Sequence, residues 1–266
     1  MNLIITGIIV LQGLLDIHFS QGDMRFVGST PCHESLTPIL KMAPQPVCEF
    51  MKWELVLKPN KTAAITITYG ESQPNTNGFK SGKVEKKLIG SVSWQGNYCK
   101  IKLDEELELT FYKLDDNVLH LVSGEEFMTG DGGFSFTLNR TEAQTSGTQY
   151  KTQQKAMTGG VFDGRTPCHE LSAMLKLSPT PDPQCIKRKW RLKLSNTTTQ
   201  AGTFELNSLK GSWRLQSALL ELDVIDHGKL YLLPVGENVL HFLDTRKQLL
   251  VGNVDFSYAL NRIPGL

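Results

Sequence analysis

Alternating apolar and polar side chains recur along this chain and predict a protein built mainly of β-strands. The segment Lys189 to Leu194 places apolar residues on one side and basic residues on the other, and Lys52 to Leu57 follows much the same pattern. A period of two is typical of a strand with one buried face. Turns rich in Gly, Asn and Asp separate the other strand candidates. These are residues 62–69, 98–103, 107–113, 117–123 and 134–139, and then 201–206, 218–224, 229–233, 238–243 and 255–260.

The period changes to a helical one at two places. Apolar residues recur at helical spacing from Leu36 to Leu40 and again from Leu171 to Leu177. Each run ends at a turn rich in proline, which a helix does not continue through. Each half of the chain is therefore expected to hold a strand, a short helix and then a meander of antiparallel strands. Many short strands with regular turns favour a β-barrel.

The two halves repeat each other in the same order at three separated places, which indicates an internal duplication. We predict two tandem antiparallel, lipocalin-like β-barrel domains, residues 23–140 and 161–266, each with one short helix after its first strand. The matching segments are Phe26 to Glu34 with Phe162 to Glu170, Asn117 to Leu121 with Asn238 to Phe242, and Phe134 to Arg140 with Phe256 to Arg262.

Two segments differ from this simple repeat. Residues 141–160 hold few apolar side chains and end in two glycines, so we expect a flexible, solvated linker between independently folded modules. The stretch from Trp53 to Trp94 is also longer than the matching stretch from Trp190 to Trp213. This difference predicts that the second copy lacks about one hairpin and forms a more open or incomplete barrel.

An apolar run from Leu3 to Leu15 is too short to span a bilayer but fits the core of a secretory signal peptide. Small residues around Ser20 and Gly22 offer a cleavage site after Gly22, so residues 1–22 are expected to form a signal peptide. A buried strand or helix at the N-terminus is the alternative. No cysteine follows the run directly, and we expect export without a lipid anchor.

The charge balance gives no support to a nucleic-acid partner. The formal net charge is +1 at pH 7, whereas nucleic-acid binding demands a concentrated basic face. A basic cluster from Lys187 to Lys193 is first expected to be the solvated face of a strand, with a docking surface for acidic partners as the alternative.

Four of the five cysteines form equivalent pairs in the two copies, Cys32 with Cys48 and Cys168 with Cys185. In an exported protein such pairs predict one disulfide per repeat. A metal site and free buried thiols are the alternatives. Cys99 has no counterpart in the second copy, and we expect a small buried residue on a strand.

A histidine beside a carboxylate occurs in both copies, His33 with Glu34 and His169 with Glu170. Such a pair can do acid–base chemistry, but its position predicts the start of a helix, where a carboxylate favours the positive end of the dipole. These four residues are candidate ligand or metal-binding groups. The pattern indicates no catalytic residues, since no nucleophile–base motif is present.

His120 and His241 occupy matching positions inside apolar strand segments. We expect a histidine in the core or lining the barrel. The alternative is that both histidines act as ligand-binding groups in a barrel cavity.

The openings Gly28-Ser29-Thr30-Pro31-Cys32 and Gly164-Arg165-Thr166-Pro167-Cys168 resemble the Gly-x-Leu-Pro-Cys opening of the NlpE-type envelope lipoproteins. The whole repeat is also similar to exported bacterial proteins of unassigned function. The resemblance implies a lipocalin-like barrel on a bacterial envelope, in the periplasm or at the cell surface, and a link to copper tolerance and envelope stress. Ser35 and Leu171 stand where that family has the second cysteine of Cys-x-x-Cys.

The sequence therefore predicts an exported, non-enzymatic binding protein whose barrels take a small apolar ligand or an envelope protein partner. No cofactor is expected from the residues, and copper only from the resemblance. The alternative is a protein of the copper or metal-stress response that binds or senses a metal through its histidines and nearby cysteines. A hydrolase or redox enzyme is the third possibility.

Overall fold

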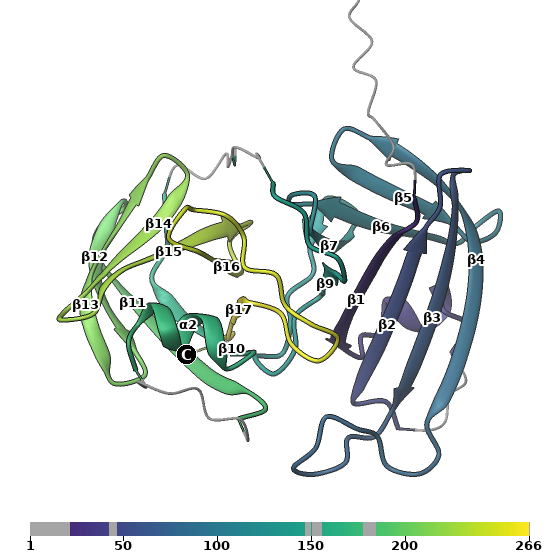
Figure 1. The fold of residues 1–266 in the computed structure, drawn as a ribbon, viewed down its shortest axis with the longest axis horizontal. Coiled ribbons are helices and arrows are strands. Elements are labelled where there is room, and N and C mark those ends of the chain that lie inside the picture. The colour runs from purple at the N-terminus through teal and green to yellow at the C-terminus, as the bar shows by residue number, and fades with distance from the viewer. Residues whose placement is uncertain (1–21, 43–46, 147–149, 151–155, 178–184, 266) are drawn as a thin grey trace, which may run out of the picture.

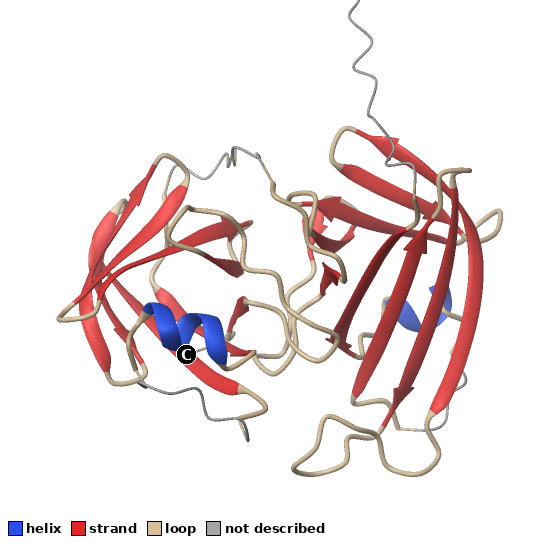
Figure 2. Ribbon diagram, in the orientation of Figure 1, coloured by secondary structure: helices blue, strands red, loops and turns tan. Residues whose placement is uncertain are grey.

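The computed structural model describes residues 22–42, 47–146, 150, 156–177 and 185–265, which form two antiparallel β-barrels and two short helices (Figures 1 and 2). The predicted fold class is thus confirmed. The expected signal peptide lies outside the described residues, except for Gly22. No helix of the described residues has the length and apolar character needed to cross a membrane.

The first barrel closes through β9, which pairs with both β1 and β7, and through the pairing of β6 with β7. β8 adds to the outer end of β7. The elements in chain order are β1 (Met24–Pro31), α1 (Leu36–Ile39), β2 (Phe50–Leu57), β3 (Thr62–Gly70), β4 (Val84–Gln95), β5 (Tyr98–Lys102), β6 (Glu108–Lys113), β7 (Val118–Ser123), β8 (Glu126–Phe127) and β9 (Thr137–Arg140).

The second barrel is also closed, in the order β10 to β17 with β17 pairing back to β10. Its elements are β10 (Gly160–Thr166), α2 (His169–Met174), β11 (Arg188–Thr198), β12 (Ala201–Leu206), β13 (Leu209–Gln216), β14 (Leu219–Val224), β15 (Gly228–Val235), β16 (Val239–Leu243) and β17 (Ala259–Arg262). β4 and β13 were absent from the strands that the pattern predicted.

The prediction of a missing hairpin in the second copy is wrong. The first copy is longer because residues 71–83 form a long loop between β3 and β4, and β3 and β4 are themselves longer. The matching turn between β12 and β13 contains only Asn207 and Ser208. Both barrels therefore keep the same order of barrel strands; they differ in the length of this hairpin and in β8, which has no counterpart strand in the second barrel.

The repeated Gly-x-Thr-Pro-Cys motif holds the same packing in each barrel. The indole Nε1 of Trp53 donates to Thr30 Oγ1 at 2.9 Å, and that of Trp190 donates to Thr166 Oγ1 at 2.9 Å. A Cβ on Gly28 would lie 2.4 Å from the carbonyl oxygen of Thr137, so only glycine allows β9 to approach β1 this closely. The motif is repeated because it joins the first strand to the core.

Both predicted disulfides are present. Cys32 and Cys48 have their Cα atoms 5.8 Å apart, and Cys168 and Cys185 have theirs 6.0 Å apart. Each bond ties the segment around a short helix to the start of the strand after it. Cys99 is a buried free thiol on β5, as expected, and burial raises its pKa to about 12.

The barrels are joined by an apolar cluster that both contribute to. Leu114 and Val118 of the first barrel pack with residues of the second, among them Leu233, Val239 and Ala259. Each barrel keeps a core of its own, and the apolar residues of this cluster exclude water between the two barrels.

The connection between the barrels is exposed at residues 141–145, 156 and 158, as expected of a solvated linker. Three of its described residues are packed. Ser146 is buried, and Met157 is buried in the core of the second barrel. Tyr150 packs against the cluster between the barrels, and its hydroxyl oxygen accepts a hydrogen bond from the backbone N–H of Leu249 at 3.0 Å.

Candidate functional site

The surface between the barrels is nearly two-fold symmetric, because matching residues of the two copies make matching contacts. Asn139 of β9 accepts a hydrogen bond from the backbone N–H of Gly252 at 2.8 Å. Asn261 of β17 accepts one from the backbone N–H of Gly130, also at 2.8 Å. The rings of Phe134 and Phe256 are parallel, with centroids 6.3 Å apart. The junction therefore resembles the isologous interface of a homodimer.

Segments 134–139 and 255–260 were predicted as strands, but the strands begin later, at Thr137 and Ala259. The residues before each strand form a loop that packs on the other barrel. In both loops an Asx side chain holds the turn: Asp131 Oδ1 accepts from the backbone N–H of Phe134 at 2.8 Å, and Asn253 Oδ1 accepts from that of Phe256 at 2.9 Å.

The two histidines of the repeated strand lie in this junction, with ring centroids 5.8 Å apart. Nε2 of His120 donates to the carbonyl oxygen of Met128 at 2.8 Å, and the hydroxyl of Thr137 lies 3.1 Å from Nδ1. Nε2 of His241 is buried and has no hydrogen-bond partner among the described residues, and Ala259 replaces Thr137 beside it. Burial lowers the pKa of His120 to about 4, and burial together with His120 lowers the pKa of His241.

His120 and His241 are buried, as expected of a core histidine, but they lie between the barrels and do not line the inside of either one. On β7 the side chains of Leu119 and Leu121 enter the core of the first barrel, so His120 points to the opposite face. That face is buried by the second barrel, which explains why the whole strand is apolar. The two imidazoles stay neutral near pH 7 and form part of the contact between the barrels.

The Cys-His-Glu segments stay at the surface. His33 and Glu34 precede α1 and are exposed, and Nδ1 of His33 accepts from the hydroxyl of Ser35 at 2.8 Å. His169 and Glu170 form the first turn of α2, as predicted for that copy.

Glu170 accepts a hydrogen bond from the hydroxyl of Tyr258. This bond ties α2 to the segment before β17. The carboxylate thus has a structural partner, and the structure brings neither of the two exposed histidines together with His120 and His241.

The residues do not fit the copper site that the resemblance implies. Cys32 and Cys168 are both in disulfides, so neither offers a thiolate ligand. Within the described residues no group of three His, Cys, Asp or Glu side chains is close enough together to hold a metal ion. The histidine nearest to the junction's centre, His120, already uses Nε2 for a hydrogen bond.

A cavity of about 470 Å³ opens at one end of the first barrel. It lies where α1 meets the ends of β6 and β7, beside the β7–β8 turn. Apolar lining comes from Leu36, Ile39, Leu109, Leu121 and Met128. Polar residues at its edge include Tyr98, Lys100, Glu108 and Thr110. The helix predicted between the cysteines therefore borders a cavity, although the helical pattern gave no sign of it.

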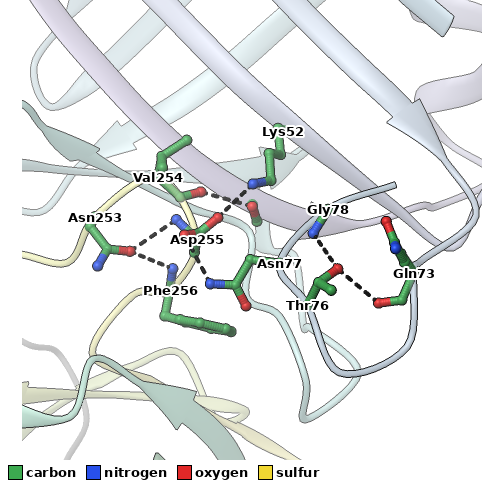
Figure 3. Close-up of polar contacts among 10 residues, drawn as sticks. Lys52, Gln73, Thr76, Asn77, Gly78, Asn253, Val254, Asp255 and Phe256 are labelled. Atoms are coloured by element: carbon green, nitrogen blue, oxygen red, sulfur yellow. Dashed lines mark hydrogen bonds and ion pairs between the residues drawn. The ribbon is translucent and has the colours of Figure 1, made fainter. Parts of the chain in front are cut away.

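One side of the junction carries an ion pair across the barrels (Figure 3). Nζ of Lys52 on β2 lies 2.6 Å from Oδ1 of Asp255, and the amide of Asn77 donates to Oδ2 of Asp255 at 3.1 Å. The hydroxyl of Ser29 donates to the carbonyl oxygen of Val254 at 2.8 Å. No sequence pattern indicates these residues, since they lie in loops and on strand faces that become partners only when the barrels meet.

Comparisons with known proteins give little further information. No family model matches the chain, and no curated protein matches it. Among solved structures, the crystal structure of the Cpx pathway activator NlpE from Escherichia coli is similar at 14% sequence identity and a TM-score of 0.26. The match covers 73% of this chain and 86% of that chain. A likeness this weak carries no argument about function.

Proposed function

We propose that this chain is a non-enzymatic binding protein of an exported compartment, and that it holds a small apolar ligand at the open end of the first barrel. The cavity between α1, β6 and β7 is the observation that carries the proposal. Its volume of about 470 Å³ falls within the range of roughly 300–1,000 Å³ that is usual for ligand sites. The lining combines six apolar residues with nine that are polar or glycine, and ligand sites use apolar side chains together with polar groups that orient the ligand.

The two disulfides support the exported compartment. Disulfides persist in oxidising surroundings and are rare where cellular thiols keep cysteines reduced. We therefore propose that the protein lies in the periplasm or at the cell surface of a bacterium. The alternative to a small apolar ligand is an envelope protein as binding partner.

The placement of reactive groups supports a binding role over catalysis. His120 and His241 are buried between the barrels, where substrate does not reach them. The thiol of Cys99 is buried and its pKa is raised to about 12, so it stays protonated near pH 7. Among the described residues we identify no nucleophile with a base beside it in an open cleft.

The test uses N-phenyl-1-naphthylamine, an apolar dye whose fluorescence rises in apolar sites. We expect saturable binding of one dye per chain and its loss in Ile39→Lys, which places a charge in the cavity. Met174→Lys is the matched control, because Met174 of α2 corresponds to Ile39 and packs against the second core. Absence of saturable binding, or equal binding by wild type and Ile39→Lys, would contradict the proposal.

A further inference from the structure

The near-symmetry of the junction allows its two sides to be compared residue by residue. On one side, here called the closed side, the carboxylate of Asp255 is bound by Lys52 and Asn77 (Figure 3). On the other, here called the open side, the matching loop residue is Gly133 and the matching strand residue is Lys189. The open side therefore keeps the lysine and lacks the carboxylate.

The loop on the open side has the same turn as the loop on the closed side. Asp131 Oδ1 accepts from the backbone N–H groups of Gly133 at 2.7 Å and Phe134 at 2.8 Å. Asn253 Oδ1 makes the equivalent bonds to Asp255 and Phe256, both at 2.9 Å. The backbone of Gly133 is thus held in the same way as the backbone of Asp255. The open side lacks only the carboxylate side chain that Asp255 provides on the closed side.

Positive charge is concentrated where the carboxylate is missing. Arg165 stands at the position of Ser29 and is directly opposite Lys189 in the pairing of β10 with β11. Its guanidinium lies 5.8 Å from the centre of the Phe134 ring. Like charges opposite each other on adjacent strands are unfavourable without a counter-charge. The pKa of nearby Lys187 is lowered by burial and then by Arg165 and Lys189, while Asp255 acts in the opposite direction.

The carboxylates near these cations already have partners. Asp163 binds Arg191 through both oxygens, at 2.8 Å to Nε and 2.5 Å to Nη2. Asp131 holds the loop, and Asp255 is bound by Lys52 and Asn77, although its charge also acts on Lys187. Within the described part of the chain, neither Arg165 nor Lys189 has an ion pair. Their charges are left for a group from outside the protein.

The open side is also accessible. On the closed side the long loop between β3 and β4 brings Asn77 over Asp255. In the second barrel the tight turn at Asn207 replaces that loop, and a cleft of about 330 Å³ lies between the barrels. Arg165, Lys189 and Arg191 line it together with Asp131, Gly133 and Asp163.

We propose that this cleft binds a ligand carrying a phosphate monoester group, held where Asp255 holds its carboxylate on the other side. Arg165 and Lys189 line the cleft and contribute two positive charges, Asp131 contributes one negative charge, and Asp163 and Arg191 neutralise each other. The two cations present several N–H donors, which match the oxygens of a phosphate, and a phosphate has more of these acceptors than a carboxylate. An arginine with a lysine beside it is a common way to bind phosphate. This cleft is separate from the apolar cavity of the first barrel, and its ligand chemistry is different.

The experiment measures binding of inorganic phosphate and phenyl phosphate to the full chain by titration calorimetry. Arg165→Ser introduces the residue that the closed side has at Ser29, and we expect binding to weaken by at least about tenfold. Gly133→Asp supplies the missing carboxylate, and we expect it to compete with phosphate and abolish binding. A Cβ on Gly133 would lie 3.1 Å from the flexible end of Arg165 and 3.1 Å from Oδ1 of Asp131, so both side chains must shift by a few tenths of an ångström to accept it.

Lys193→Ala is the control, since Lys193 lies on β11 outside this cleft and we expect unchanged affinity. Far-ultraviolet circular dichroism confirms that each variant is folded. Phosphatidylcholine vesicles with phosphatidic acid form a second arm, in which binding that depends on Arg165 places the phosphate on a lipid headgroup. The proposal is overturned if neither soluble phosphate nor these vesicles bind the wild type, or if Arg165→Ser and Gly133→Asp bind as the wild type does.

Discussion

The buried histidine pair makes the stability of the junction depend on pH in a definite direction. An unfolded histidine gains its proton near pH 6.5, whereas burial lowers the pKa of His120 in the folded protein to about 4. Between these values the unfolded chain binds a proton that the folded protein does not bind. The free energy of unfolding therefore falls as the pH falls from about 6.5 toward 4.

The size of this effect follows from the difference in pKa. A shift from 6.5 to about 4 makes the folded state about 2 to 3 kcal/mol less stable at pH 4.5 than at pH 7, by proton linkage at roughly 1.4 kcal/mol per pH unit. The lowered pKa of His241 acts in the same direction. Buried Asp115 acts in the opposite direction, because its pKa is raised mainly by burial.

The perturbation is His120→Gln, which keeps a side-chain donor for the carbonyl oxygen of Met128. The assay is urea unfolding at pH 7 and pH 4.5, followed by tryptophan fluorescence. We expect the wild type to lose about 2 to 3 kcal/mol more than the variant between these pH values. The contributions of Asp115 and other acids are common to both proteins and cancel. Equal losses in the two proteins would refute the reasoning.

Three further outcomes are expected. Cys168→Ser, which removes the disulfide to Cys185, should lower the free energy of unfolding by about 3 kcal/mol in a urea titration. The disulfide closes a loop in the unfolded chain and so reduces the entropy that unfolding gains; a loss near zero would contradict this. Cys99 should resist iodoacetamide at pH 8 in the folded protein and react in urea, because its thiol is buried with a pKa of about 12, and fast native labelling would show that it is exposed. Asn261→Ala should cost about 1 to 3 kcal/mol, because the backbone N–H of Gly130 then loses its acceptor at the junction; unchanged urea stability would rule out that role.

The pattern of the sequence predicted the strands, the helices and the disulfides well because these depend on local periodicity and on the repeat. It failed where one face of a strand has a partner from the other barrel. An apolar strand such as β7 gives no indication of which face meets its own core, and His120 was for that reason expected inside the barrel. The longer stretch before Trp94 was taken as an extra hairpin, although only the loop and its strands had lengthened.

The candidate sites were less predictable than the fold. The apolar cavity depends on how α1 seats against β6 and β7, which residue spacing does not specify. The cationic cleft arises because Gly133 has no side chain where the other copy has the carboxylate of Asp255. This difference can be recognised only when the two sides of the junction are compared. The basic cluster around Lys189 was noted as a solvated strand face, yet its partner Arg165 lies on a different strand.

The sequence by itself determined two copies of one barrel, their helices, their cysteine pairs and the motif that joins the first strand to the core. These features follow from repeated residues and from side-chain alternation, which act over short stretches of chain. Only the tertiary structure decided that the barrels share an apolar junction, that His120 and His241 meet within it, and that its two sides differ in charge. Contacts between residues more than a hundred positions apart depend on how two complete surfaces fit, and no local pattern encodes that fit.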